Sequence, residues 1–259
     1  MSVYEAKKYL QYRLKAGNEH SIHSPFVFKL YTEAIKNKSK YYAYEELDKI
    51  RAALLQDHTL IEITDLGAGS KKLKQARKIA EIAKISVVQK KYGELLFRLV
   101  NYFQPKTILE LGTSLGLSAM YMSKAAPGAE IITAEGCPNT FQYARSLISK
   151  YETQNIKPIN SSFEEVFKDQ SEKRNVDFVY IDGNHTYEAT IKYLHELLEI
   201  TNENSILVFD DIYWSPGMTK AWNEIKEHAA VTVTIDLFKM GLVFFRKENK
   251  HKENFCLRY

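Results

Sequence analysis

The sequence predicts an α/β fold, a doubly wound, mostly parallel sheet with an antiparallel C-terminal hairpin and a helical N-terminal extension. Three observations support this prediction. From about residue 92 onward, short apolar runs alternate with stretches of helical periodicity. One apolar run breaks into a glycine turn at 107–118. Two strand-like runs, 231–237 and 242–246, flank a short turn near the C-terminus, which is typical of a hairpin.

The front of the chain is predicted to be mostly helical. Apolar residues recur at helical spacing and predict helices at 4–16, 26–36, 44–55 and 71–84. A second glycine loop, 65–70, follows the apolar run at 60–63. We interpret it as a tight turn, because no strand ending in an acid follows at the required distance; the alternative is a lid or substrate loop. We expect residues 1–85 to form the extension and 86–259 the main domain.

Seven strands, with the helices between them, account for most of the rest. Strands are expected at 107–111, 130–134, 156–160, 177–181, 205–209, 231–237 and 242–246. Helices are expected at 94–103, 117–125, 139–150, 187–200 and 218–228. Because the two kinds of element alternate, the helices should cover both faces of a parallel sheet.

The glycine turn after the first of these strands has the features of a nucleotide-cofactor site. Gly112 permits a sharp turn, Gly116 permits close approach of a ligand, and the following helix start offers free N–H groups. The next strand ends in Glu135, 19 residues after Gly116, where an acid can hold ribose hydroxyls. A nicotinamide site would have another glycine, and it would not explain Glu110 inside the strand. We therefore favour S-adenosylmethionine over NAD.

From about Ser86 onward the sequence resembles the class I methyltransferases, and more narrowly the metal-dependent O-methyltransferases of the catechol and caffeoyl-CoA type. The resemblance implies a Rossmann-like, seven-stranded sheet and S-adenosylmethionine as the cofactor. In such enzymes the residue at the position of Ser118 contacts the methionine carboxylate, and the residue at the position of Glu135 contacts the ribose. The residues near the positions of Ser161 and Ser162 contact the adenine, and the residue at the position of Val88 closes over the cofactor. The resemblance thus assigns cofactor contacts to Val88, Glu110, Gly112, Ser114, Gly116, Ser118, Glu135, Ser161, Ser162 and Asp182.

Three acids follow two neighbouring predicted strands, Asp182 after one and the pair Asp210 and Asp211 after the next. Ligands of open α/β sheets bind at the carboxyl ends of strands, and clustered carboxylates suit Mg²⁺ or Mn²⁺. Such an ion lowers the pKa of a bound hydroxyl. In catechol-type enzymes these positions hold Asp, Asp and Asn, so Asp211 departs from the pattern. We expect a metal site at these three residues; the alternative is that they are helix caps or turn residues.

His185 follows Asp182 by three residues, where catechol-type enzymes carry a lysine. A histidine titrates near neutrality and suits general base catalysis. The spacing of Asp182, Gly183, His185 and Tyr187 also resembles a group of bacterial sugar and small-molecule methyltransferases. We expect Asp182 and His185 to be catalytic; the alternative is that His185 caps the helix that begins near Tyr187.

The charge distribution and the composition limit which binding partners and which cellular location we expect. Residues 1–91 hold 18 basic and 10 acidic side chains, whereas 92–259 hold 18 and 22. The basic front suits RNA or another anion, or else reflects solvated helix faces. Two cysteines make no disulfide framework, no apolar run reaches membrane-spanning length, and the start lacks a signal-peptide core. We expect a cytoplasmic protein without membrane contact.

The leading hypothesis is an S-adenosylmethionine-dependent O-methyltransferase that acts on a small hydroxylated acceptor, assisted by Mg²⁺ or Mn²⁺ and a histidine base. An RNA (tRNA) methyltransferase that docks through the basic front is one alternative. A non-catalytic cofactor-binding protein is another, and a nicotinamide oxidoreductase is the least favoured. The front helices are candidates for a homodimer contact. The acceptor itself is not encoded in any motif of this sequence.

Overall fold

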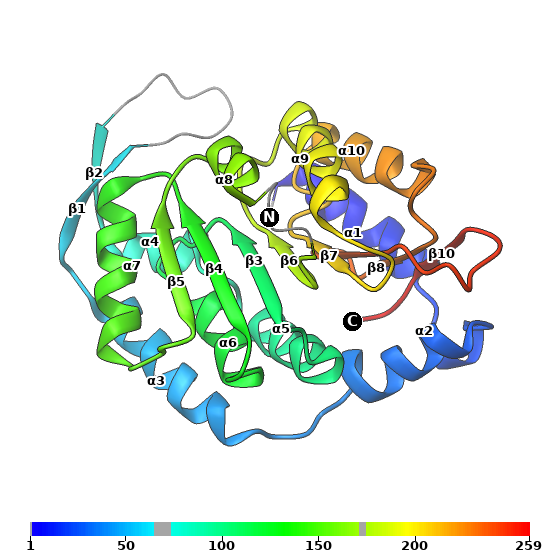
Figure 1. Ribbon diagram of the computed structural model, residues 1–259, viewed down its shortest axis with the longest axis horizontal. Helices are drawn as coiled ribbons and strands as arrows, with labels where there is room; N and C mark the ends of the chain where they lie inside the picture. Colours follow the sequence, from blue (N-terminus) through cyan, green and yellow to red (C-terminus); the bar gives the residue numbers. More distant parts are fainter. Residues whose placement is uncertain (1, 65–73, 171–174) are drawn as a thin grey trace. The chain divides into compact units, whose positions relative to one another are not determined.

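The structure is a computed structural model that describes residues 2–64, 74–170 and 175–259. The chain divides into two compact units. The terminal unit combines Met1–Thr32 with Phe167–Tyr259, and the middle unit comprises Glu33–Val166. Each has strands of its own and helices that cover them (Figure 1).

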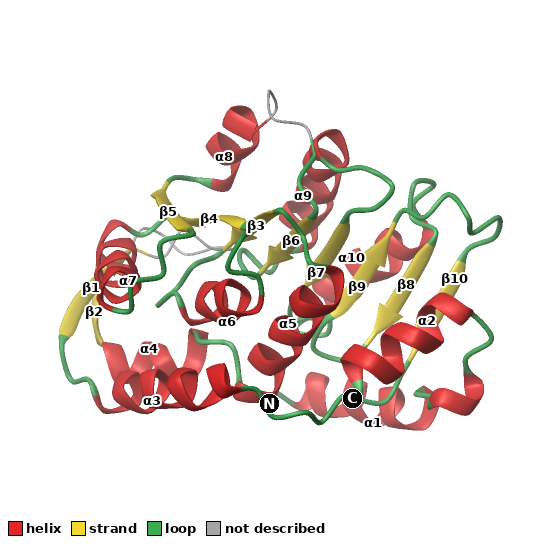
Figure 2. Ribbon diagram, turned by 60° about the horizontal axis from the view of Figure 1, so that its bottom comes forward, coloured by secondary structure: helices red, strands yellow, loops and turns green. Residues whose placement is uncertain are grey.

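The middle unit is built around three parallel strands. Its sheet elements are β1 (Leu60–Thr64), β2 (Lys74–Lys78), β3 (Thr107–Leu111), β4 (Glu130–Glu135) and β5 (Ile156–Asn160). Its helices are α3 (Tyr42–Gln56), α4 (Ile79–Ser86), α5 (Lys90–Phe103), α6 (Leu117–Ala125) and α7 (Pro138–Lys150), preceded by a π-helical turn, η2 (Tyr31–Ile35). Strand β4 lies between β3 and β5, parallel to both. Helices α6 and α7 pack against β4 and β5, and α5 packs against α6 (Figure 2).

The terminal unit contains β6 (Phe178–Ile181), β7 (Ile206–Phe209), β8 (Val233–Asp236), β9 (Gly241–Phe244) and β10 (Glu253–Cys256). Its helices are α1 (Val3–Lys15), η1 (Glu19–Ser21), α2 (Pro25–Leu30), α9 (Tyr187–Ile200) and α10 (Pro216–Glu227), and α8 (Phe163–Gln170) precedes β6 in the chain. The strand order within the unit is β10-β8-β9-β7-β6. Strands β6 and β7 are parallel, whereas β9 runs antiparallel to both β7 and β8.

The first helices are joined to the last residues of the chain. The Tyr12 hydroxyl donates to the carbonyl of Leu257 at 2.6 Å, and the Tyr31 hydroxyl donates to that of Arg258 at 2.8 Å. The Arg258 Nε donates to the carbonyl of Ala16 at 2.9 Å. Because these groups are partly or fully buried, the contacts satisfy backbone carbonyls that water does not reach easily. The predicted extension, 1–85, is therefore shared between the two units.

Most predicted elements are confirmed, including the strand–helix alternation and the antiparallel hairpin, in which Asp236 pairs with Gly241. The helix predicted at 71–84 is wrong over Lys74–Lys78, which pairs with β1 as a strand; α4 begins only at Ile79. Strand β10 and helix α8 were not predicted. The glycine loop at 65–70 lies outside the described residues. No helix in the described part of the chain is long and apolar enough to cross a membrane.

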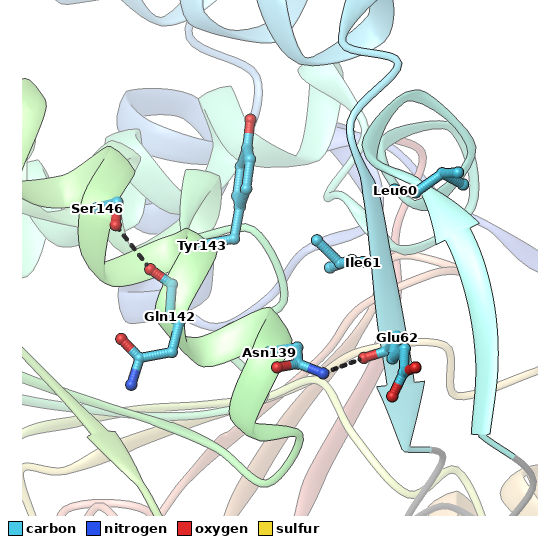
Figure 3. Close-up of a pocket in the computed structure, with 7 residues that line it drawn as sticks. All are labelled: Leu60, Ile61, Glu62, Asn139, Gln142, Tyr143 and Ser146. Carbon is cyan, nitrogen blue, oxygen red and sulfur yellow. Dashed lines mark hydrogen bonds between the residues drawn. The ribbon is translucent and has the colours of Figure 1, made fainter.

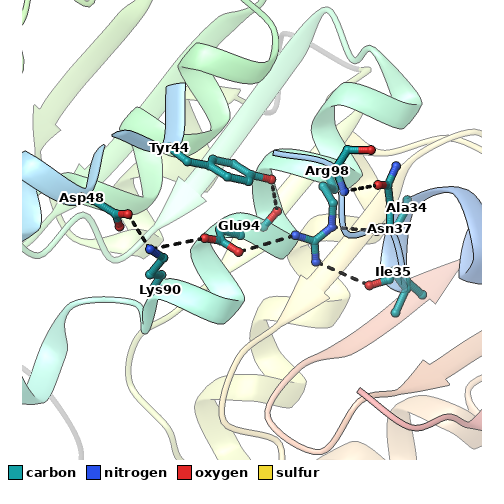
Figure 4. A network of polar contacts seen from close by, with 9 residues as sticks. Ala34, Ile35, Asn37, Tyr44, Asp48, Lys90, Glu94 and Arg98 are labelled. Carbon is teal, nitrogen blue, oxygen red and sulfur yellow. Dashed lines mark hydrogen bonds and ion pairs between the residues drawn. The ribbon is translucent and has the colours of Figure 1, made fainter. Parts of the chain in front are cut away.

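A buried arginine links the end of η2 to α5 in the middle unit (Figure 4). Arg98 is 6% exposed, and its guanidinium donates to the carbonyls of Ala34 at 2.8 Å and Ile35 at 3.4 Å. Glu94 lies 4.0 Å from the same guanidinium. The arginine thus satisfies helix-end carbonyls that have no partner within the helix.

We expect Arg98→Met to lower the free energy of unfolding by about 3 kcal/mol, because it leaves buried carbonyls without their charged donor. Urea unfolding followed by circular dichroism measures this loss. The control is Arg145→Met, whose exposed guanidinium donates to an exposed glutamine on its own helix, Gln142, and lies 5.5 Å from the ring centre of Phe141; it should change stability by less than about 0.5 kcal/mol. Equal losses in the two variants would contradict the assigned role of Arg98.

Candidate functional site

The loop between β3 and α6 adopts the backbone conformation that its glycines predict. Gly112 has φ 109° and Gly116 has φ 85°, values that favour glycine, and Gly116 precedes the first turn of α6. The N–H groups of Gly112 and Thr113 both donate to the carbonyl of Ala134, at 3.0 and 3.1 Å. The loop is therefore held against the end of β4, and α6 begins beside it with the free N–H groups of a helix start.

Glu135 connects this loop to the end of β4. One carboxylate oxygen accepts from the N–H of Ser114 at 3.0 Å, and the other accepts from the N–H of Cys137 at 2.9 Å. Both bonds orient the carboxylate, and a carboxylate has further lone pairs with which to accept hydroxyl protons. The predicted ribose ligand is thus fixed in place by backbone donors.

The remaining predicted cofactor residues of the first motif surround the same loop. Glu110 is fully buried and accepts a 2.5 Å hydrogen bond from Thr133. Ser118 is buried in the first turn of α6. The Ser114 Oγ is shielded from solvent and has no hydrogen-bond partner among the described residues. A shielded hydroxyl of this kind usually has a partner, so its position fits a polar ligand at the loop.

The other predicted cofactor contacts, Val88, Ser161 and Ser162, lie outside the β3–α6 loop. Val88 is buried, two residues before α5. Ser161 and Ser162 both contact Glu165: the Ser161 hydroxyl and the Ser162 N–H donate to its carboxylate at 2.9 and 3.1 Å. The two serines thus take part in the first turn of α8. Their assignment to the adenine stays a prediction.

The predicted acids Asp182 and Asp210 meet in the terminal unit. They directly follow β6 and β7, whose parallel register pairs Ile181 with Phe209. The N–H of Asp210 donates to the carbonyl of Ile181 at 2.9 Å, which extends this pairing by one residue. Adjacent parallel strands therefore bring the two carboxylates to the same edge of the sheet.

A tyrosine that the sequence analysis missed bridges these acids. The Tyr180 hydroxyl lies 3.1 Å from Asp182 and 3.0 Å from Asp210. A hydroxyl has one proton, so it can donate to only one carboxylate at a time. Burial, followed by the charges of Asp182 and Asp211, raises the pKa of Asp210 well above its usual range. The other carboxyl oxygen of Asp210, Oδ1, is buried and has no hydrogen-bond partner among the described residues. Tyr180 and Asp182 share a strand face, a period-two signal that could have revealed the contact.

His185 contacts Asp182, which precedes it by three residues. Its Nε2 lies 3.4 Å from an oxygen of Asp182, and its side chain is 25% exposed. Burial lowers the pKa of His185, but the hydrogen bond to Asp182 and the nearby carboxylate charges outweigh it and raise the pKa to about 9. The side chain that caps α9 is Thr186, which accepts from the N–H of Ala189. The alternative of His185 as the helix cap is therefore wrong.

Asp211, the third predicted metal ligand, is paired with a lysine. The Lys239 Nζ lies 2.9 Å from Oδ1 of Asp211, and the two side chains are 24% and 19% exposed. Asp211 has φ 51°, in the left-handed region, and its carbonyl accepts from the N–H of Trp214 at 2.8 Å. The sequence analysis missed Lys239 as a partner, although it located the hairpin turn that carries it.

These contacts do not fit a divalent metal. Among the described residues no group of three or more His, Cys, Asp or Glu side chains is arranged to hold a metal ion. Asp182 is engaged by His185, Asp211 by Lys239, and Asp210 by Tyr180. Hard cations need several carboxylate or carbonyl oxygens that converge on one point. The predicted metal would have to displace these partners.

Tyr213 and Trp214 follow the acid pair. The Tyr213 hydroxyl donates to the buried Asp236, and its ring stacks on Phe238 at 5.7 Å. Trp214 is 52% exposed. Its exposed indole leaves an aromatic surface next to the acids in the chain.

A pocket of about 560 Å³ lies elsewhere, beside β1 and α7 (Figure 3). Its lining includes Leu60, Ile61 and Tyr143, and the side chain of Asn139 closes one end by donating to the carbonyl of Glu62 at 2.8 Å. None of the predicted site residues lines it. We therefore place two candidate sites at the strand ends, the Glu135 cluster in the middle unit and the acid cluster in the terminal unit, and neither in this pocket.

Comparison with known proteins supports the predicted fold, and a methyltransferase family model matches part of the chain. Residues 109–212 match the family model of a methyltransferase domain. An O-methyltransferase from Bacillus cereus, solved in complex with SAH, is 16% identical with a TM-score of 0.57, over 82% of this chain and 95% of that one. The SAH-bound methyltransferase PaMTH1 from Podospora anserina is 15% identical with a TM-score of 0.60, over 87% and 97%.

A further solved structure is the O-methyltransferase TomG from Streptomyces achromogenes, which is involved in tomaymycin synthesis and was solved in complex with SAM. It is 14% identical with a TM-score of 0.56, over 85% of this chain and 96% of that one. At such identities the likeness concerns the fold. The predicted Rossmann-like α/β fold, with its mostly parallel sheet and antiparallel C-terminal strands, is confirmed.

We expect Asp182→Asn to lower the pKa of His185 from about 9 toward its ordinary value of 6.5, because the anionic partner is lost. A pH titration of the histidine ring signals by NMR measures the shift. Since the folded pKa exceeds the unfolded one, the pair stabilises the fold fully below pH 6.5 and ceases to do so as the pH rises through about 9. Glu188→Gln, an exposed acid on α9, is the control. A pKa that stays near 9 in Asp182→Asn would refute the pairing.

Proposed function

We propose that this class I S-adenosylmethionine-dependent methyltransferase moves a methyl group from S-adenosylmethionine to a hydroxyl oxygen of a small acceptor. Membership of the class rests on the methyltransferase match over residues 109–212 and on the shared fold. The observation that carries the choice of oxygen is the His185–Asp182 pair, a proton-handling group at the end of β6. The O-methyltransferases among the structural neighbours, one of them in a small-molecule synthesis, support the same choice.

The β3–α6 loop and Glu135 are proposed to hold the cofactor. S-adenosylmethionine supplies a methyl group on a sulfonium, which an oxygen nucleophile can attack directly. Glu135, oriented by the N–H groups of Ser114 and Cys137, has capacity left for ribose hydroxyls. The start of α6, with Ser118, suits the methionine carboxylate, because helix N-termini bind anions. The unpartnered hydroxyl of Ser114 gives the loop a further polar contact.

His185 and Asp182 are proposed to act on the acceptor. With a pKa of about 9, His185 carries a proton at neutral pH. In that state its ring can donate to an acceptor oxygen that has already released its proton to water. His185 can take up that proton itself only as the pH approaches 9. During transfer the S–CH₃ bond breaks and an O–CH₃ bond forms, so the oxygen is most reactive as an anion. Acidic hydroxyls, such as phenols, are therefore the favoured acceptors.

A divalent metal at Asp182, Asp210 and Asp211 was the sequence-based prediction for activating the acceptor. The observed partners of these acids do not favour it, and the proton chemistry proposed above requires no metal. A cation could enter only if His185 and Lys239 released their carboxylates.

We expect S-adenosylmethionine to bind the purified protein with one-to-one stoichiometry, and Glu135→Ala to weaken binding by at least about tenfold, because about 1.4 kcal/mol of hydroxyl and loop contacts is lost. Isothermal titration calorimetry measures both. Glu130→Ala, on the same strand but paired with the exposed Lys157, is the matched control.

Transfer itself is tested by following S-adenosylhomocysteine release with a panel of phenols, catechols and sugars. Turnover of a phenol or catechol that is lost in His185→Asn supports the proposal. Absence of cofactor binding in the wild-type protein would refute it. So would cofactor binding combined with methylation of nitrogen acceptors alone.

A further inference from the structure

We infer that Lys239 is the resident cation of the acid cluster, a positioning residue that holds Asp211 and takes the place predicted for a divalent metal. The inference deepens the proposed function and rests on it for its catalytic meaning. It predicts that the positive charges at this site come from protein side chains and not from a metal ion. Asp182, Asp210 and Asp211 would then serve as anchors for His185, Tyr180 and Lys239, and not as metal ligands.

Two backbone hydrogen bonds fix the position of the lysine in the fold. It lies in the turn between β8 and β9, where the N–H of Leu237 donates to the carbonyl of Met240 at 2.9 Å. Its own carbonyl accepts from the N–H of Ile212 at 3.3 Å, next to Asp211. The hairpin turn and the loop after β7 are thus joined by a backbone hydrogen bond as well as by the ion pair. The ammonium is placed by this geometry.

Asp211 is in turn oriented toward the lysine. Its φ of 51° lies in the left-handed region, which non-glycine residues seldom adopt. The backbone bond from Trp214 and the 2.9 Å contact with Lys239 hold it there.

Each acid of the cluster contacts a side chain of the protein. His185 lies 3.4 Å from Asp182, and Lys239 lies 2.9 Å from Asp211. The Tyr180 hydroxyl lies within 3.1 Å of Asp182 and Asp210, while the buried Oδ1 of Asp210 has no partner among the described residues. Partly buried carboxylates are costly without compensation, and the ammonium of Lys239 supplies it for Asp211. A divalent ion bound to Asp211 would have to displace this ammonium.

The test is a calorimetric titration of Mn²⁺ into chelator-treated, full-length protein, with and without saturating S-adenosylmethionine. The variants are wild type, Lys239→Met, Lys239→Gln and a control, Lys157→Met, which removes an ion pair of similar length on an exposed surface. Circular dichroism establishes that each variant is folded. We expect no saturable heat up to 1 mM Mn²⁺ (about 4 kcal/mol of binding free energy) in wild type and control. In both Lys239 variants we expect binding at least about tenfold tighter than this limit, removed by adding Asp210→Ala.

Saturable Mn²⁺ binding by the wild type, lost in Asp210→Ala, would overturn the inference. Folded Lys239 variants that also fail to bind Mn²⁺ would overturn it as well, because the lysine would not be what excludes the ion. If neither Lys239 variant folds, the wild-type titration alone decides. The titration without cofactor separates this result from the proposed function: a protein that never binds S-adenosylmethionine refutes the function, whatever its response to Mn²⁺.

Discussion

The acid cluster depends on the parallel pairing of β6 with β7. This register, continued by the hydrogen bond from Asp210 to Ile181, fixes which acids meet at the strand ends. A shift of one residue would turn Tyr180 and Asp182 together to the opposite face and separate both from Asp210. The strands themselves are fully buried and apolar, so burial specifies the register strongly. The arrangement of the acid cluster at the sheet edge is therefore a consequence of how the buried strands β6 and β7 pair.

Electrostatics then determines what the cluster can do. Three partly buried carboxyl groups repel one another. A histidine, a tyrosine and a lysine contact them and offset this repulsion. Such pairing occupies carboxylates that could otherwise attract a divalent ion, and a pKa of about 9 keeps a proton on His185 at neutral pH. The separate cluster around Glu135 carries the complementary features, a fixed carboxylate and a helix start, that a nucleoside cofactor requires.

The sequence predicts best what is local. The glycines at 112 and 116, the strand that ends in Glu135, and the spacing of Asp182 and His185 follow from neighbouring residues. Strand β2 has no apolar pattern, since Lys74–Lys78 is strand only through its pairing with β1. Strand β10 is short and pairs with β8, so its strand character likewise depends on a distant segment. Lys239 meets Asp211 across 28 residues, and no local signal could assign that partner. The prediction of Asp211 as a metal ligand was made without knowledge of this ion pair.

The most direct test of the account is a crystal structure of the protein grown with S-adenosylhomocysteine and Mn²⁺, with diffraction data collected at the manganese absorption edge. The account predicts density for the nucleoside against Glu135 and the β3–α6 loop. It also predicts Lys239 within hydrogen-bond distance of Asp211, and no anomalous peak among Asp182, Asp210 and Asp211. A manganese peak coordinated by these acids, with Lys239 displaced, would contradict it.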